Sequence, residues 1–154
     1  MKNFQLIFLL LIINFGGLYI GSLLMNNGPI SDWYMSLNQA PWTPPGWVFG
    51  FAWTVIMVCF SIYLAYLFSW QNSKFLWLFY AFQVLLNVSW NYIFFNQHMT
   101  NFGLVVIVSL LIVILYYFLT FRAESLQKLR FLLLPYISWL CIAISLNLYV
   151  VIHN

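Results

Sequence analysis

The sequence predicts an all-α fold: an integral membrane bundle of five transmembrane helices with a structured first loop. Of its 154 residues, 65% are hydrophobic and only 5% are charged, and the mean hydropathy is +0.95. A soluble domain of this length cannot bury so much apolar surface. The apolar residues also fall into five runs of roughly 20 residues, the length at which a helix crosses a bilayer.

The five runs are expected to form a single membrane domain over residues 1–154. The breaks between the later runs are short, so consecutive helices should be antiparallel neighbours in a compact bundle. The predicted helices are approximately 4–25, 44–70, 75–95, 102–121 and 129–152.

The first run follows Lys2 but is too long for a secretory signal and lacks an A-x-A-like cleavage site. We therefore expect it to remain as a helix. Gly17 and Gly21 have the GxxxG spacing, which lets another helix approach closely. The approaching helix could belong to the same chain or to a second copy, and the motif alone does not decide between them.

All five cations fall on one side of this five-helix path. They are too sparse for a nucleic-acid interface, but they predict the orientation. By the positive-inside rule the N-terminus is cytoplasmic and the C-terminus external. The cations are Lys2, Lys74, Arg122, Lys128 and Arg130.

The first loop leads into an aromatic, proline-rich entry to the second helix, "APWTPPGWVFGFAW". Thr43 is expected to cap this helix, with Pro44 and Pro45 in its first turn, where a missing N–H costs nothing. Trp53 lies two turns into the helix, deeper than an interfacial anchor needs to be. It is expected to face either packed protein or a cavity.

Aromatic side chains also gather in and beside the first loop. An interfacial aromatic belt explains them without any ligand, and closure over a binding site is the alternative. They are Trp33, Tyr34, Trp42 and Trp47.

The third helix carries polar side chains on one face, namely Gln83, Asn87, Trp90 and Asn91. Amides in hydrocarbon need partners, so this face is predicted to look into the bundle. Its amides could bond other helices or a ligand.

The fifth helix places a second such face inward, with Pro135 near its start. The small Ala143 beside the large Trp139 is consistent with either tight helix packing or space for a ligand. The face comprises Tyr136, Trp139 or Leu140, Ala143 and Asn147.

These inward faces carry no acidic or basic residue, so a proton relay or an ion-coupled transport site lacks its usual parts. No Ser-His-Asp set, HExxH motif or Gly-rich phosphate loop can be assembled, and no metal or cofactor is expected. An interior of tryptophans and amides instead favours a large, flat, apolar and aromatic ligand.

The same residues carry a resemblance to a known family. The chain resembles the translocator protein family, also called tryptophan-rich sensory proteins or peripheral-type benzodiazepine receptors, and in particular its bacterial members. The resemblance covers essentially all five runs, and it implies a location in a bacterial cell membrane. It rests on "WY" at 33–34, "PWTPPGWVFGFAWT" at 41–54, the Q-x-x-x-N-x-x-W of the third helix and "PYISWLCIAISLN" at 135–147.

The resemblance implies a homodimeric five-helix membrane receptor or sensor whose first loop folds over a pocket for protoporphyrin IX and related tetrapyrroles. Such a protein would regulate or transport porphyrins and would be linked to oxidative stress. Sterols and synthetic benzodiazepine-site ligands are further implied partners. The implied ligand-binding residues are Tyr34, Trp53, Gln83, Asn87, Trp139 and Ala143, whereas Trp33, Trp42 and Trp47 are assigned to the fold and to loop closure.

Two alternatives to sensing stay open. In one, the resemblance implies light-dependent degradation of protoporphyrin IX, for which Trp53 and Trp139 would be the catalytic residues. In the other, the protein passively transports a lipophile or a sterol.

Sterol binding ranks below porphyrin binding because the family's motif at the end of the last helix is broken after Tyr149. The acid that the family often carries in its fourth helix is also missing from "LVVIVS" at 104–109.

Overall fold

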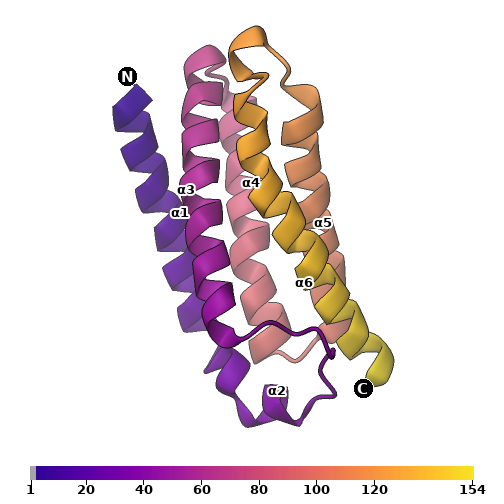
Figure 1. Ribbon diagram of the computed structural model, residues 1–154. Helices are drawn as coiled ribbons and strands as arrows, with labels where there is room; N and C mark the ends of the chain where they lie inside the picture. Colours follow the sequence, from indigo (N-terminus) through magenta and orange to yellow (C-terminus); the bar gives the residue numbers. More distant parts are fainter. Residues whose placement is uncertain (1–2) are drawn as a thin grey trace.

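The computed structural model describes residues 3–154, which form five long helices packed side by side (Figure 1). All five are long and apolar enough to cross a membrane. The all-α, five-helix membrane fold is therefore confirmed. The long helices are α1 (Asn3–Leu24), α3 (Gly46–Trp70), α4 (Lys74–Asn91), α5 (Thr100–Thr120) and α6 (Leu134–His153).

Shorter helical segments fill the connections and the helix ends. The first loop, residues 25–45, contains η1 (Gly28–Ile30) and α2 (Asp32–Ser36), as expected for a structured connection. A π-helical turn, η2 (Tyr92–Asn96), extends α4. The 3-10 segments η3 (Glu124–Leu126) and η4 (Leu129–Leu133) join α5 to α6.

The predicted start of α3 is wrong by two residues. The helix begins at Gly46 with Pro45 as its N-cap, and Pro45 has an extended ψ of 148°. A residue that precedes proline is disfavoured in the helical region, so Pro44 cannot belong to the first turn. The Thr43 hydroxyl donates to the carbonyl of Ala40, at 2.7 Å, instead of capping the helix.

The core is built around Phe60 of α3, which is fully buried. Its ring meets those of Tyr80, Tyr117 and Tyr136 at centroid distances of 6.3, 6.0 and 5.5 Å. One aromatic side chain thereby ties together α3, α4, α5 and α6.

A polar cluster of Asn14, Ser61 and Tyr80 joins α1, α3 and α4 inside the membrane. The Asn14 amide donates to the Ser61 hydroxyl at 2.8 Å and accepts from the Tyr80 hydroxyl, also at 2.8 Å. Hydrogen bonds of this kind satisfy polar groups that lipid cannot satisfy.

The GxxxG glycines of α1 face α4 of the same chain. A methyl group added to Gly17 would lie 3.6 Å from Val84 and 3.7 Å from Val88, and one added to Gly21 would meet the Asn91 amide. Of the two uses that the motif left open, the structure shows the contact within the chain.

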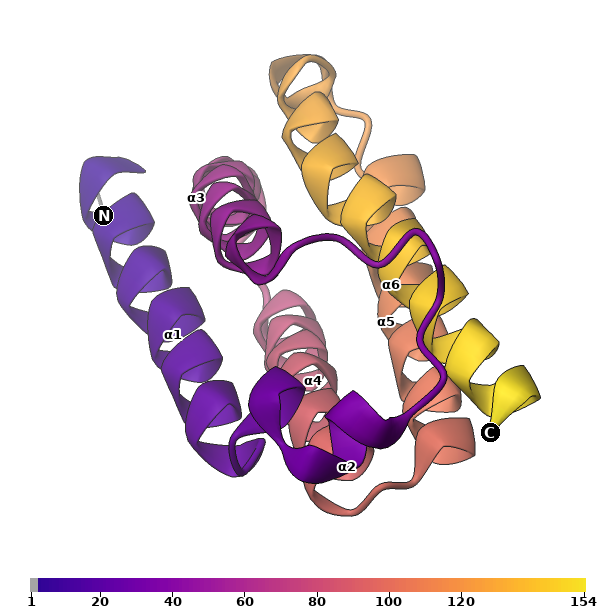
Figure 2. The same ribbon diagram turned by 60° about the horizontal axis from the view of Figure 1, so that its bottom comes forward.

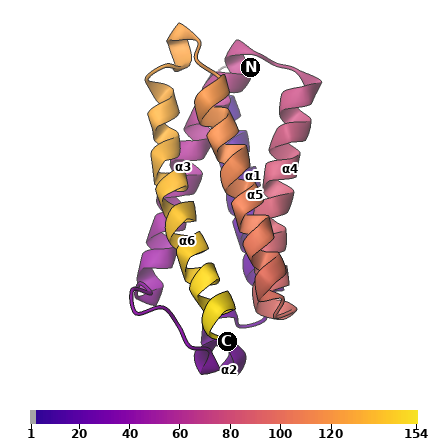
Figure 3. The same cartoon turned by 90° about the vertical axis from the view of Figure 1, so that its right-hand side faces the viewer.

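The first loop and the cations lie at opposite ends of the bundle. The loop and the C-terminus lie together at one end, and the connections that carry Lys74, Arg122, Lys128 and Arg130 lie at the other (Figure 3). Lys2 lies outside the described residues.

Candidate ligand-binding pocket

The first loop folds back across the ends of α4 and α6 (Figure 2). Asn26, Asn27 and Gly28 have φ of 45°, 68° and 46°, so three successive left-handed residues reverse the chain after α1. The Ser31 hydroxyl then caps α2 by accepting from the backbone N–H of Tyr34 at 3.3 Å. This local geometry directs Trp33 and Tyr34 toward the bundle.

Two sets of contacts hold the loop against the helices. At the α2 end, Trp33 stacks on His98 with ring centroids 4.0 Å apart, and its edge meets Phe94 at 5.7 Å. Near the end of α6, the Asn154 side chain accepts from the backbone N–H of Asn38 at 2.8 Å and donates to its carbonyl at 3.3 Å.

Trp42 and Trp47, the other two tryptophans assigned to loop closure, differ in their contacts. Trp42 donates to the Ser145 hydroxyl at 3.1 Å, and its ring meets Tyr149 edge-on at 5.4 Å. Trp42 therefore supports loop closure, as Trp33 does. Trp47 is 73% exposed on α3, so the prediction that it closes the loop is wrong, and its position suits an interfacial aromatic residue.

The π-helical turn at the end of α4 supplies the floor under α2. The backbone N–H of Gln97 reaches back five residues to the carbonyl of Tyr92, at 3.0 Å. The extra residue in this turn lets both Phe94 and Phe95 point inward, and both are buried. Trp90 stacks on Phe94 with centroids 5.2 Å apart.

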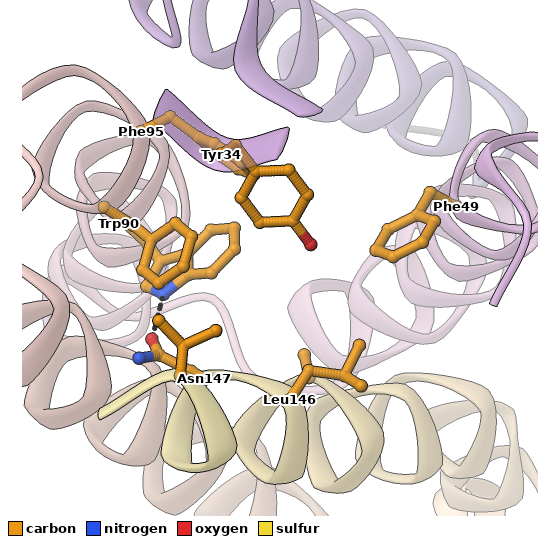
Figure 4. A pocket seen from close by; sticks show the side chains of 9 residues that line it. Tyr34, Phe49, Trp90, Phe95, Leu146 and Asn147 are labelled. Carbon is orange, nitrogen blue, oxygen red and sulfur yellow. Dashed lines mark hydrogen bonds between the residues drawn. The ribbon is translucent and has the colours of Figure 1, made fainter. Parts of the chain in front are cut away.

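A central cavity of about 30 Å³ lies between this floor, the first loop and α6 (Figure 4). A second cavity, of about 240 Å³, opens toward α1 and α3. Phe49, Trp90 and Phe95 line both, so these three rings separate them. The central cavity is lined by Tyr34, Phe49, Trp90, Phe94, Phe95, Ala143, Leu146, Asn147 and Val150.

The lining is apolar and carries no charged side chain. Asn147 is already engaged, because it accepts from the Trp90 indole at 3.3 Å and donates to the carbonyl of Thr100 at 3.0 Å. The Tyr34 hydroxyl points into the cavity (Figure 4) and has no hydrogen-bond partner within residues 3–154. Burial raises the pKa of this phenol, so it stays a neutral donor at physiological pH.

The six predicted ligand-binding residues fall into two layers. Tyr34 and Ala143 line the central cavity, and Trp53 lines the second one. Gln83, Asn87 and Trp139 are buried and line neither cavity. The faces of α4 and α6 do point inward, as predicted.

Two of the residues that line neither cavity, Gln83 and Trp139, are linked to the cavity walls through contacts with other side chains. Gln83 donates to the Tyr136 hydroxyl at 2.9 Å, and the Tyr136 ring meets Trp53 edge-on at 5.9 Å. Trp139 meets Phe49 edge-on at 5.1 Å. The structure gives Gln83 and Trp139 positioning contacts behind the cavity walls.

Sequence reasoning missed three aromatic residues of the central cavity lining, Phe49, Phe94 and Phe95. Phe49 lies one turn before Trp53, and Phe94 one turn after Trp90, so helical spacing was a usable signal for both. Phe95 had no such signal, because only the π-helical turn brings it inward. No group of three metal-ligating side chains occurs in the described part of the chain.

Comparison with known proteins agrees with this architecture. The model of the TspO/MBR family matches residues 8–152, which is nearly the whole chain. The chain belongs to that family.

Several relatives are about a third identical to this chain over the aligned residues. The tryptophan-rich protein TspO of Archaeoglobus fulgidus is 31% identical over 81% of this chain and 82% of its own length. Protein CrtK of Rhodobacter capsulatus is 33% identical over 75% and 74%. The tryptophan-rich sensory protein of Cereibacter sphaeroides is 32% identical over 75% and 73%.

Proposed function

We propose that this protein is a membrane sensor that binds a flat, apolar tetrapyrrole such as protoporphyrin IX beneath its first loop. The observation that carries the proposal is the aromatic cavity under that loop, with the unpaired Tyr34 hydroxyl as its polar handle. The name of the sensory relative in Cereibacter sphaeroides supports the sensing role. A homodimer remains part of the proposal.

The cavities require a conformational change before they accept such a ligand. Their volumes of about 30 and 240 Å³ are below the roughly 300–1,000 Å³ typical of pockets for drug-sized ligands. Rotation of Phe49 and Trp90 would merge them, and movement of the first loop would open them to the outside. The structure is therefore a closed form in this proposal.

The charge distribution adds a preference among porphyrins. The cations of residues 3–154 lie at the other end of the bundle, so the propionates of a porphyrin find no ion-pair partner beside the cavity. Burying an unpaired carboxylate is costly. We expect the dimethyl ester of protoporphyrin IX to bind at least as tightly as the free acid.

The test is a titration of protoporphyrin IX into the purified protein in detergent, in the dark, followed by tryptophan fluorescence. Saturable quenching that weakens in Trp53→Phe supports the site. Trp70→Phe is the matched control, because Trp70 is 51% exposed at the other end of α3. Equal, non-saturating quenching in parent and variants would show that the porphyrin merely partitions into micelles.

Light-dependent degradation of the bound porphyrin is a second candidate, favoured by the position of Trp53 in the wall of the second cavity. Trp139 lies behind Phe49 and would need that ring to move before it reached a ligand. Illuminating the same samples tests the idea. Loss of product formation in Trp53→Phe or Trp139→Phe with binding retained would support it.

Passive transport of a porphyrin or sterol is distinguished by flux across protein-containing vesicles. Ligand movement above that of empty vesicles would support transport. Saturable binding without flux would support sensing.

A further inference from the structure

An arginine side chain lies between two aromatic rings at the end of the bundle opposite the cavities. The guanidinium carbon of Arg130 is 5.1 Å from the ring centroid of Phe118 and 5.3 Å from that of Phe131. The two rings stand at 72° to each other, with centroids 6.1 Å apart. They hold the guanidinium in place by cation–π contacts, which favour arginine over lysine.

The Arg130 side chain has a hydrogen-bond donor that lacks an acceptor. The Nε of Arg130 is buried and has no hydrogen-bond partner in the described part of the chain. A buried donor on a charged group is costly when it stays unpaired. Glu124, the acid of the same connection, forms no ion pair with Arg130.

The surroundings add further positive charge. Arg122 and Lys128 belong to the same connection and are exposed, and Lys74 lies at the same end of the bundle. Arg130 also lies just before α6, whose first turn contains no acidic residue. The positive end of that helix dipole therefore reinforces the cationic side chains instead of being neutralised.

We propose that Arg130 is the centre of a binding site for the phosphate group of an anionic membrane phospholipid. A planar guanidinium matches phosphate oxygens with two parallel hydrogen bonds, and a shift of the half-exposed Phe131 ring would let one of them reach the buried Nε. Arg130 makes the contact that distinguishes an anionic headgroup from a zwitterionic one, and the exposed Arg122 and Lys128 add only a weaker, solvent-screened positive potential around it.

The apolar side of the site indicates a lipid and not free phosphate. Phe131 is 52% exposed and Leu134 is 43% exposed, next to Arg130 on the outside of the bundle. Acyl chains would cover these side chains while the headgroup sits on the guanidinium. Free phosphate makes no use of them.

The experiment measures lipid retention by native mass spectrometry. The purified protein is mixed with phosphatidylglycerol or phosphatidylcholine that carry identical acyl chains. We expect the parent to retain phosphatidylglycerol roughly tenfold better than phosphatidylcholine. A tenfold preference corresponds to about 1.4 kcal/mol, which is the contribution of one hydrogen bond to a charged group. Equal retention of the two lipids in the parent overturns the proposal without any variant.

Variants then locate the site. Arg130→Gln should remove most of the preference, and Arg130→Lys should restore only part of it because the planar fork is lost. Arg122→Gln is the matched control: it removes an equal charge from the same connection, and we expect a change of at most about twofold. Equal losses in Arg122→Gln and Arg130→Gln, or full recovery in Arg130→Lys, would show a diffuse charge effect and overturn the site.

Inorganic phosphate distinguishes the two sources of the anion. Millimolar phosphate should leave the retained phosphatidylglycerol in place. Displacement by phosphate alone would contradict the lipid assignment. Circular dichroism melting of each variant checks that it is folded.

Discussion

The Tyr34 hydroxyl is the one polar side-chain group in the wall of the central cavity that still lacks a protein partner within residues 3–154. Asn147 is engaged with Trp90 and Thr100, and Gln83 donates to Tyr136. The Gln83 carbonyl oxygen has no partner in the described residues, but it is buried behind the wall and lines neither cavity. Orientation of a ligand in an otherwise apolar cavity therefore depends on the residue that the first loop delivers.

Replacing Tyr34 by phenylalanine should weaken porphyrin binding by roughly three- to tenfold, the value of one net hydrogen bond of about 1 kcal/mol. The ring stays, so its contacts with Phe94 and Phe95 are preserved. The dissociation constant is measured by fluorescence titration in the dark. Unchanged affinity in Tyr34→Phe would remove the hydroxyl from the site.

The pH dependence follows from the same residue. Because burial raises the Tyr34 pKa above its ordinary value near 10, the phenol remains protonated at neutral and mildly alkaline pH. Binding of the dimethyl ester, which carries no propionate charge, should stay constant between about pH 6.5 and 9. A tenfold loss within that range would contradict a neutral phenol handle.

At the scale of elements, α1 and α4 approach each other along glycine. A methyl group added to Gly17 would contact Val84 and Val88, whereas one added to the preceding Gly16 would have no neighbouring atom within 4 Å. Two adjacent glycines thus differ in their surroundings while sharing a helix and a depth. They form a natural matched pair.

Gly17→Leu should destabilise the protein by about 1–3 kcal/mol, because the added side chain has no space against α4. Gly16→Leu should have little effect, since its position is open. The measurement is the thermal unfolding midpoint of both variants in one detergent. Equal midpoints would show that the α1–α4 contact tolerates separation.

The first loop is the other element whose contacts matter, because in the proposed function it covers the ligand-binding cavity. Asn154 pairs with both backbone groups of Asn38, which is 116 residues earlier in the chain. Removing this pair should leave the fold intact and release one side of the loop.

In Asn154→Ala, porphyrin association and dissociation should both accelerate by roughly fivefold, since about 1 kcal/mol of loop contact is lost. Stopped-flow fluorescence measures both rates. Ser36→Ala is the control, because the Ser36 hydroxyl bonds only the carbonyl of Trp33 within its own turn. Unchanged rates in Asn154→Ala would show that the loop does not limit entry.

At the scale of the whole molecule, charge and cavity are segregated to opposite ends. Lys74, Arg122, Lys128 and Arg130 mark one end, and the first loop covers the other (Figure 1). We propose that the cationic end faces the cytoplasm, in line with the positive-inside rule. The pocket would then open to the outside.

Cysteine labelling tests this orientation. Ser36→Cys in the first loop should react with a membrane-impermeant thiol reagent in intact cells, and Ser125→Cys at the cationic end should react only after permeabilisation. Both serines are exposed. The parent protein, whose Cys59 and Cys141 lie within α3 and α6, gives the background. The reverse labelling pattern would invert the topology.

The sequence by itself determined the membrane class, the five helices and their inward faces. Apolar length and helical spacing are local properties, so Gln83, Asn87, Tyr136 and Trp139 could be placed in the interior without coordinates. The family resemblance added a ligand-binding role for Tyr34, Trp53 and Ala143, and the structure places these three residues in the cavity walls.

Only the tertiary structure decided the rest, because it depends on contacts between residues far apart in the chain. The π-helical turn that brings Phe95 inward, the pairing of Asn154 with Asn38 and the Phe118–Arg130–Phe131 arrangement have no local signature. The start of α3 was misplaced because Pro45 disfavours the helical conformation at the preceding Pro44, and this restriction outweighed the capping signal at Thr43. Periodicity fixes which face of a helix is buried, whereas packing fixes what that face meets.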